Sequence, residues 1–152
     1  MTDLIDALRE QEERLIFDRF DNTDAWRLGG RLVELATERG LPVAVDIRRG
    51  TQQLFHAALP GSTADNDAWI VRKVRVVERF GASSFLVGRR LAADGKELGA
   101  AHGVDPADFA AHGGAFPVRI RNVGVVGVVT VSGLPQADDH ALVVEAITAH
   151  LS

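Results

Sequence analysis

The spacing of apolar side chains predicts helices in the first part of the chain, followed by a pair of strands. Apolar residues recur at helical spacing over 3–17 and 24–39, and Gly40 follows the second helix where a left-handed cap is expected. Residues 43–47 alternate strictly between apolar and polar or small side chains. A turn and a return strand over 52–58 complete the pattern of a β-hairpin.

In the second half of the chain helices again precede a pair of strands, and the strand signals are stronger. Asp105 and Pro106 form an N-cap followed by proline at the first helical position, which favours a short helix there. The valine-rich stretch is apolar on both faces, as expected for a central strand. The pattern predicts helices over 65–80, 83–91, 105–111 and 138–151, and strands over 117–121 and 123–131.

The order of these elements favours an α+β fold in a single domain, residues 1–152. Both strand pairs read as hairpins, with no strand–helix–strand crossover between parallel strands. Such strands form an antiparallel sheet whose apolar faces must be covered by the helices. Nothing in the composition along the chain marks a linker.

Composition narrows the classes of function. The 152 residues include 46% hydrophobic and 25% charged side chains, typical of a soluble globular protein. Long apolar runs and a basic, apolar leader are absent, so we expect a cytoplasmic protein without a membrane partner. A net charge of −4 argues against general nucleic-acid binding. Absent cysteines and scattered histidines predict no bound metal.

Lys73 is the one residue of the 65–80 helix that breaks its pattern. The helix places it between Trp69 and Phe80, inside the apolar arc that should face the sheet, whereas the neighbouring arginines share a solvated face. In one interpretation its aliphatic stem packs there and its ammonium reaches solvent or a carboxylate. In the other, the charge points into a cleft near His112 and Gly113 and binds an anion.

Three further positions have a structural and a functional interpretation. His140 falls in the first turn of the last helix, either at the edge of the core or as a cleft acid/base beside Asp138 and Asp139. Gly113 and Gly114 precede a strand, where glycines form a left-handed cap or let the backbone approach a ligand. The resulting candidate ligand site comprises Lys73, Trp69, His112, Gly113, Gly114 and His140.

The sequence contains no recognisable catalytic constellation. No G-x-S-x-G motif is present, and adjacent carboxylates such as Asp138 and Asp139 point about 100° apart on a helix. Asp46 points to the opposite face of its strand from Val43, Val45 and Ile47. That face could be exposed to solvent or lie in a groove between the sheet and the helices, and we favour solvent. We therefore assign no catalytic residue and expect a binding protein rather than an enzyme.

The sequence resembles the haem-degrading-domain family of GlcG/HbpS-like proteins, in particular its uncharacterised short single-domain branch. The resemblance covers nearly the whole chain and rests on three stretches, which are 69–73 with 79–84, 111–118, and 126–136 leading into Asp139 and His140. It implies a profilin-like α/β/α sandwich with a central antiparallel sheet and a tendency to form homo-oligomers. Some relatives bind haem, so haem is a cofactor implied by the resemblance alone.

Three functions follow from these observations. The first is a protein that binds a small anionic metabolite between the 65–80 helix and the sheet. The second is an interaction module that acts by assembling with itself, since the apolar face of the first helix (Leu4, Ile5, Leu8, Leu15, Ile16 and Phe17) exceeds what a monomer of this size would cover. The third is haem binding or degradation.

Overall fold

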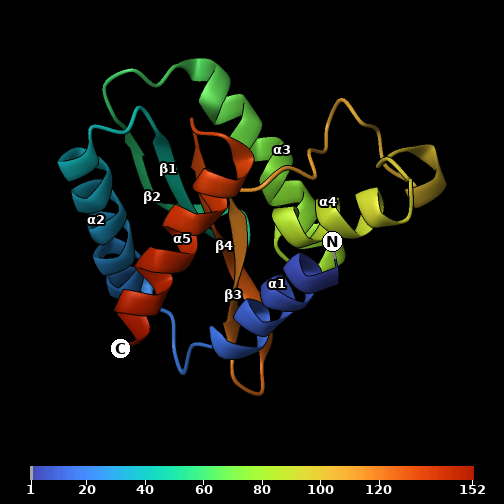
Figure 1. Ribbon diagram of the computed structural model, residues 1–152. Coiled ribbons are helices and arrows are strands. Elements are labelled where there is room, and N and C mark those ends of the chain that lie inside the picture. Colours follow the sequence, from blue (N-terminus) through green and yellow to red (C-terminus); the bar gives the residue numbers. More distant parts are fainter. Residues whose placement is uncertain (1) are drawn as a thin grey trace.

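The computed structural model describes residues 2–152, which form helices packed on both faces of a four-stranded sheet (Figure 1). The elements in chain order are α1 (Thr2–Arg14), α2 (Asn22–Arg39), β1 (Ala44–Arg49), β2 (Gln52–Ala58), α3 (Ala64–Phe80), α4 (Ser84–Ala93), the 3₁₀ turn η1 (Ala100–His102), β3 (Ala115–Ile120), β4 (Gly124–Ser132) and α5 (Gln136–Leu151). The strand order is β2-β1-β4-β3, and every neighbouring pair is antiparallel. The predicted α+β sandwich is confirmed.

The two faces of the sheet bury apolar clusters of different size. Helices α2 and α5 cover one face, where the main core lies, and α3 covers the other (Figure 1). Helices α1 and α4 pack together near the start of β3 and form a third apolar cluster. A two-pronged pair between Arg39 and Glu145, at 2.8 and 2.6 Å, links α2 to α5 at the surface. The arrangement leaves α3 with the more polar face of the sheet.

The first helix ends earlier than predicted, and most of the predicted apolar face is covered within the monomer. Phe17 leaves the helix because its N–H donates to the Arg119 carbonyl and its own carbonyl accepts from Arg121, which makes a parallel bridge to Ile120. Leu8, Leu15 and Phe17 are buried. Ile5 and Ile16 are partly buried and Leu4 is 40% exposed, so part of the predicted apolar face remains accessible and the homo-oligomer stays a prediction.

The helix predicted over 105–111 does not form. Asp105 makes one capped turn, accepting from the Ala107 N–H, but the chain then extends so that the Ala110 N–H can reach the carbonyl of Arg72 at 3.1 Å. Contact with α3 therefore overrides the local helix signal. The short 3₁₀ turn at Ala100–His102 lies just before it.

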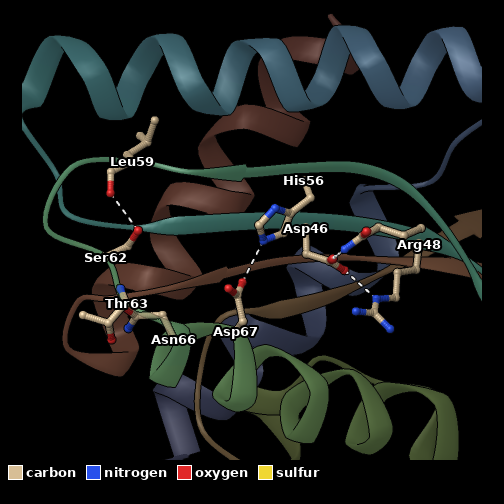
Figure 2. Close-up of polar contacts among 9 residues, drawn as sticks. Asp46, Arg48, His56, Leu59, Ser62, Thr63, Asn66 and Asp67 are labelled. Carbon is tan, nitrogen blue, oxygen red and sulfur yellow. Dashed lines mark hydrogen bonds and ion pairs between the residues drawn. The ribbon is translucent and has the colours of Figure 1, made fainter.

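The expectation that Asp46 faces solvent is wrong. Its side chain is 1% exposed, lies between the sheet and α3, and accepts from Arg48 at 2.8 Å and Gln53 at 2.6 Å. Figure 2 shows Asp46 with Arg48. Beside them, His56 of β2 faces Asp67 of α3, with Nε2 and Oδ1 2.7 Å apart. The Asp46 contacts join β1 to β2, and the His56–Asp67 contact links the sheet to the first turn of α3.

Two adjacent glycines of α2 provide a test of this packing. A Cβ on Gly29 would overlap the ring of Phe55, whereas a Cβ on Gly30 meets nothing within 4 Å. We expect Gly29→Ala to destabilise the fold by about 1–3 kcal/mol through overpacking, and Gly30→Ala to stabilise it by about 0.5–1 kcal/mol through helix propensity. Urea unfolding of both variants measures the difference. Equal effects of the two would contradict the placement of α2 on the sheet.

Candidate functional site

Lys73 lies on the side of α3 that faces the sheet, as its helical position predicts. Only 3% of the residue is exposed. Its ammonium donates to the carbonyl of Val131 and to Oδ2 of Asp139, each at 3.2 Å. The helix that holds it is capped at its start by Thr63, whose N–H donates to the Asn66 side chain, and at its end by Gly81 in the left-handed conformation. The charge therefore reaches a carboxylate, and that carboxylate is itself buried.

Asp139 belongs to the start of α5 and is 2% exposed. Its second oxygen, Oδ1, accepts from the backbone N–H of Leu134 at 3.0 Å. Burial raises the pKa of Asp139 to about 6, although the Lys73 ammonium and the backbone donors oppose the rise. Burial also lowers the pKa of Lys73, opposed by Asp139. Loss of hydration thus outweighs the mutual attraction of these two groups.

A cavity of about 280 Å³ opens beside this ion pair. It lies between the first turns of α3, the end of β4 and the start of α5. Its lining consists of Asp65, Asn66, Trp69, Lys73, His112, Ser132, Gly133, Leu134, Gln136 and Asp139. We call it the Lys73 cavity. Three of the six predicted site residues, Lys73, Trp69 and His112, line it directly.

Gly113 and Gly114 lie behind the cavity wall and allow close approach of backbone segments. The Gly113 N–H donates to Oε1 of Gln136, and a Cβ on Gly113 would collide with the Gln136 carbonyl. Gly114 has φ +135°, and a Cβ there would lie 2.8 Å from the Lys73 ammonium. Close approach, rather than helix capping, is therefore what these glycines provide, and it makes room for the lysine.

His112 is exposed at the rim, in a cationic environment. Its ring meets Trp69 edge to face, with centroids 5.4 Å apart, and the guanidinium of Arg72 lies 4.6 Å from the centroid of the Trp69 ring. Partial burial lowers the pKa of His112, and the positive charges of Lys73, Arg72 and Arg89 lower it further. The rim of the cavity therefore has a positive potential that acts on a neutral imidazole.

His140 lies in the core, away from the cavity. This agrees with the structural interpretation of His140 rather than with a role as a cleft acid/base. It is 3% exposed, packs against the rings of Phe85 and Phe116, and shares a 2.7 Å hydrogen bond between Nε2 and the Gln11 side chain of α1. It does not line the Lys73 cavity. Burial lowers its pKa to about 4.

Sequence patterns missed the partners of Lys73. The ammonium on an apolar face required a counter-charge, but 66 residues separate Lys73 from Asp139. Ser132, Leu134 and Gln136 are also in the lining. The only local signal for them was the strand terminus followed by a proline and an acidic helix start. Which helix would lie against that terminus depends on the sheet order.

Helices on both faces of a central antiparallel sheet place the protein among α/β/α sandwich proteins. Within residues 2–152, none of the helices is both long and apolar enough to cross a bilayer. The model of the family described as haem degrading protein HbpS-like matches residues 20–148. The chain belongs to this family.

Relatives of known sequence and structure agree with this assignment. A UPF0303 protein of Streptomyces coelicolor is 64% identical over 92% of this chain and 89% of its own length. The crystal structure of the Ybr137w protein superposes with a TM-score of 0.87 at 33% identity, over 95% of this chain and 86% of that one. The crystal structure of a PduOC:Heme complex gives a TM-score of 0.72 at 18% identity, over 86% of this chain and 94% of that one, which shows the shared fold.

Removing the ammonium tests the buried pair. We expect Lys73→Met to destabilise the protein by about 3 kcal/mol at pH 8, because Asp139 loses its counter-ion and must either stay charged while buried or bind a proton at a pH where the unfolded chain leaves it ionised. The double variant Lys73→Met/Asp139→Asn should regain most of that loss, since the amide oxygen can still accept from Leu134. Chemical denaturation of the wild type, the single variant and the double variant measures the loss and the recovery of stability. An additive double variant would mean that the two groups do not interact.

The buried imidazole predicts loss of stability in acid. The folded protein favours neutral His140, because its pKa falls from 6.5 to about 4. Its contribution is full above pH 6.5 and declines as the pH falls toward 4, by about 3 kcal/mol in total. Asp139 acts in the opposite direction, because its raised pKa favours the fold as pH falls.

Comparing wild type with His140→Gln isolates the histidine from this opposing effect. Urea unfolding between pH 7.5 and 4.5 should show a smaller loss of stability in the variant. An equal loss in both proteins would contradict the assignment.

Proposed function

We propose that this protein binds a small anionic metabolite in the Lys73 cavity, with the Lys73 ammonium as the recognising charge. The supporting observation is a buried cation on a cavity wall with unused donor capacity. An ammonium has three N–H donors, and the two acceptors within reach, Val131 and Asp139, occupy two of them. The third is available to a ligand oxygen.

The neighbouring carboxylate makes this binding depend on protons. An anion placed beside Lys73 also lies near Asp139, and repulsion between them raises the pKa of Asp139 further above its value of about 6. Uptake of a proton by Asp139 removes the repulsion and leaves the ammonium to the ligand. We therefore expect binding and protonation of Asp139 to be coupled.

The remaining lining favours a small polar ligand. Asn66, Ser132 and Gln136 offer hydrogen-bonding groups, and Trp69 supplies an apolar wall. A few polar groups placed around such a wall are typical of metabolite sites. The volume of about 280 Å³ suits a compact molecule.

Haem does not fit this cavity. A haem site needs an apolar slot with an axial ligand. The Lys73 cavity has mostly polar and charged walls, with Trp69 and Leu134 as its large apolar side chains. We accordingly place no haem in it, although PduOC, which shares the fold, has a crystal structure as a haem complex.

Calorimetric titration with acetate, malonate and inorganic phosphate tests the proposal. We expect saturable binding of at least one of them, tighter at pH 5.5 than at pH 8, with proton uptake visible as a dependence on the ionisation enthalpy of the buffer. A charge-assisted contact of about 1.5–3 kcal/mol corresponds to about ten- to a hundredfold in affinity. Lys73→Met/Asp139→Asn should lose that affinity while remaining folded.

The single variant Asp139→Asn is the matched control. It removes the titrating group and keeps the ammonium, so it should bind at both pH values with little pH dependence. Binding by the double variant as tight as by wild type would contradict the proposal. A Soret shift on haem titration that depends on Lys73 would overturn the choice of ligand. No binding of any anion, together with a stable oligomer in light scattering, would favour self-assembly as the function.

A further inference from the structure

A second cavity, of about 400 Å³, lies on the other side of His112. It is bounded by α4, by the chain after α4 and by the extended segment that leads to His112. Gly88 allows this segment to lie against α4, because a Cβ there would collide with the carbonyl of Ala111. Its lining is Arg72, Gly88, Arg89, Leu91, Ala92, Lys96, Glu97, Leu98, Pro106, Phe109, Ala110, Ala111 and His112. We call it the Arg89 cavity.

Two arginines from different helices line this cavity, and each has a buried donor without a partner among the described residues. Arg72 of α3 donates from Nη2 to the carbonyl of Pro106 at 3.0 Å, but its Nε is buried and has no partner among residues 2–152. The Nε of Arg89, on α4, is likewise buried without a partner in that part of the chain. A buried donor left unsatisfied costs about 1–3 kcal/mol, so a shift of these two side chains that gives each Nε an acceptor would be favourable.

The charges of the cavity are out of balance. Three cations line it, Arg72, Arg89 and Lys96, and Glu97 is the one carboxylate among its described lining residues. Over the described residues, no carboxylate lies within 4 Å of any of the three cations. Although the protein has a net charge of −4, this cavity therefore carries an excess of positive charge. Such a site attracts an anion.

The rest of the wall is apolar. Leu91, Leu98 and Phe109 are partly buried and pack on the cluster that α1 and α4 share. Pro106 and the alanines at 92, 110 and 111 add further carbon surface. This differs from the polar Lys73 cavity, so the two sites call for different ligands.

We propose that the Arg89 cavity binds an organic carboxylate with an apolar body, such as a medium-chain fatty acid or an aromatic acid. The carboxylate lies against the guanidinium groups of Arg72 and Arg89, whose charges no carboxylate of the described residues balances. The apolar body lies along Leu91, Leu98 and Phe109. This inference is independent of the ligand in the Lys73 cavity.

Octanoate is a suitable probe because Trp69 reports on the site. The Arg72 guanidinium lies over the Trp69 ring, so a carboxylate bound to Arg72 should change Trp69 emission. The other tryptophan, Trp26, is 64% exposed and can be replaced by phenylalanine to give a single-tryptophan background. We expect a saturable fluorescence change with octanoate, and at least tenfold weaker binding of the uncharged octanamide.

Variants separate this site from general surface binding. Arg89→Met should weaken octanoate binding at least tenfold, and Ala92→Phe, at an exposed position in the wall, should block it without disturbing the fold. Arg75→Met is the matched control, because Arg75 lies one turn from Arg72 on α3, contacts Asp108 and does not line the cavity. It should leave octanoate binding unchanged.

The Lys73→Met/Asp139→Asn variant distinguishes the two proposals. It should retain octanoate binding, whereas Arg89→Met should retain binding of the small anions tested in the Lys73 cavity. The assignment is overturned if octanoate binding does not saturate, if Arg89→Met and Ala92→Phe both bind like wild type, or if octanamide binds equally well.

Discussion

The buried contact between Lys73 and Asp139 is the constraint around which the rest of the structure is arranged. It joins α3 on one face of the sheet to α5 on the other, at the end of the sheet where β4 stops and β3 starts. Two desolvated charges are tolerable only while they stay together, so neither helix can shift alone. Gly114 and the carbonyl of Val131 fit closely around the ammonium for the same reason.

Periodicity predicted most of the elements because their local and tertiary preferences agree. The strand predicted over 52–58 and the helix predicted over 65–80 are found within one residue of their expected limits. The errors occur where a distant contact prevails. Phe17 leaves its helix to pair with β3, and the 105–111 segment extends to reach α3. Neither partner is visible in a short sequence window.

In the candidate site, too, the features set by local pattern were predictable and those set by distant contacts were not. The position of Lys73 on its helix was evident from the spacing of its neighbours, since a helix fixes the angle of every side chain. The identity of its partner was not, because it depends on which helix covers which face of the sheet. Asp46 was misplaced for a related reason. Alternation tells which residues share a face, but not that α3, Arg48 and Gln53 would cover the polar face.

The bridge between Phe17 and Ile120 has a consequence for the two edges of the sheet. It occupies part of the outer side of β3, and α4 packs beside the same strand, so that edge is closed to another strand. Over residues 2–152 no segment pairs with the outer side of β2. Any strand that extends this sheet, from a second copy or from another protein, must therefore add at β2.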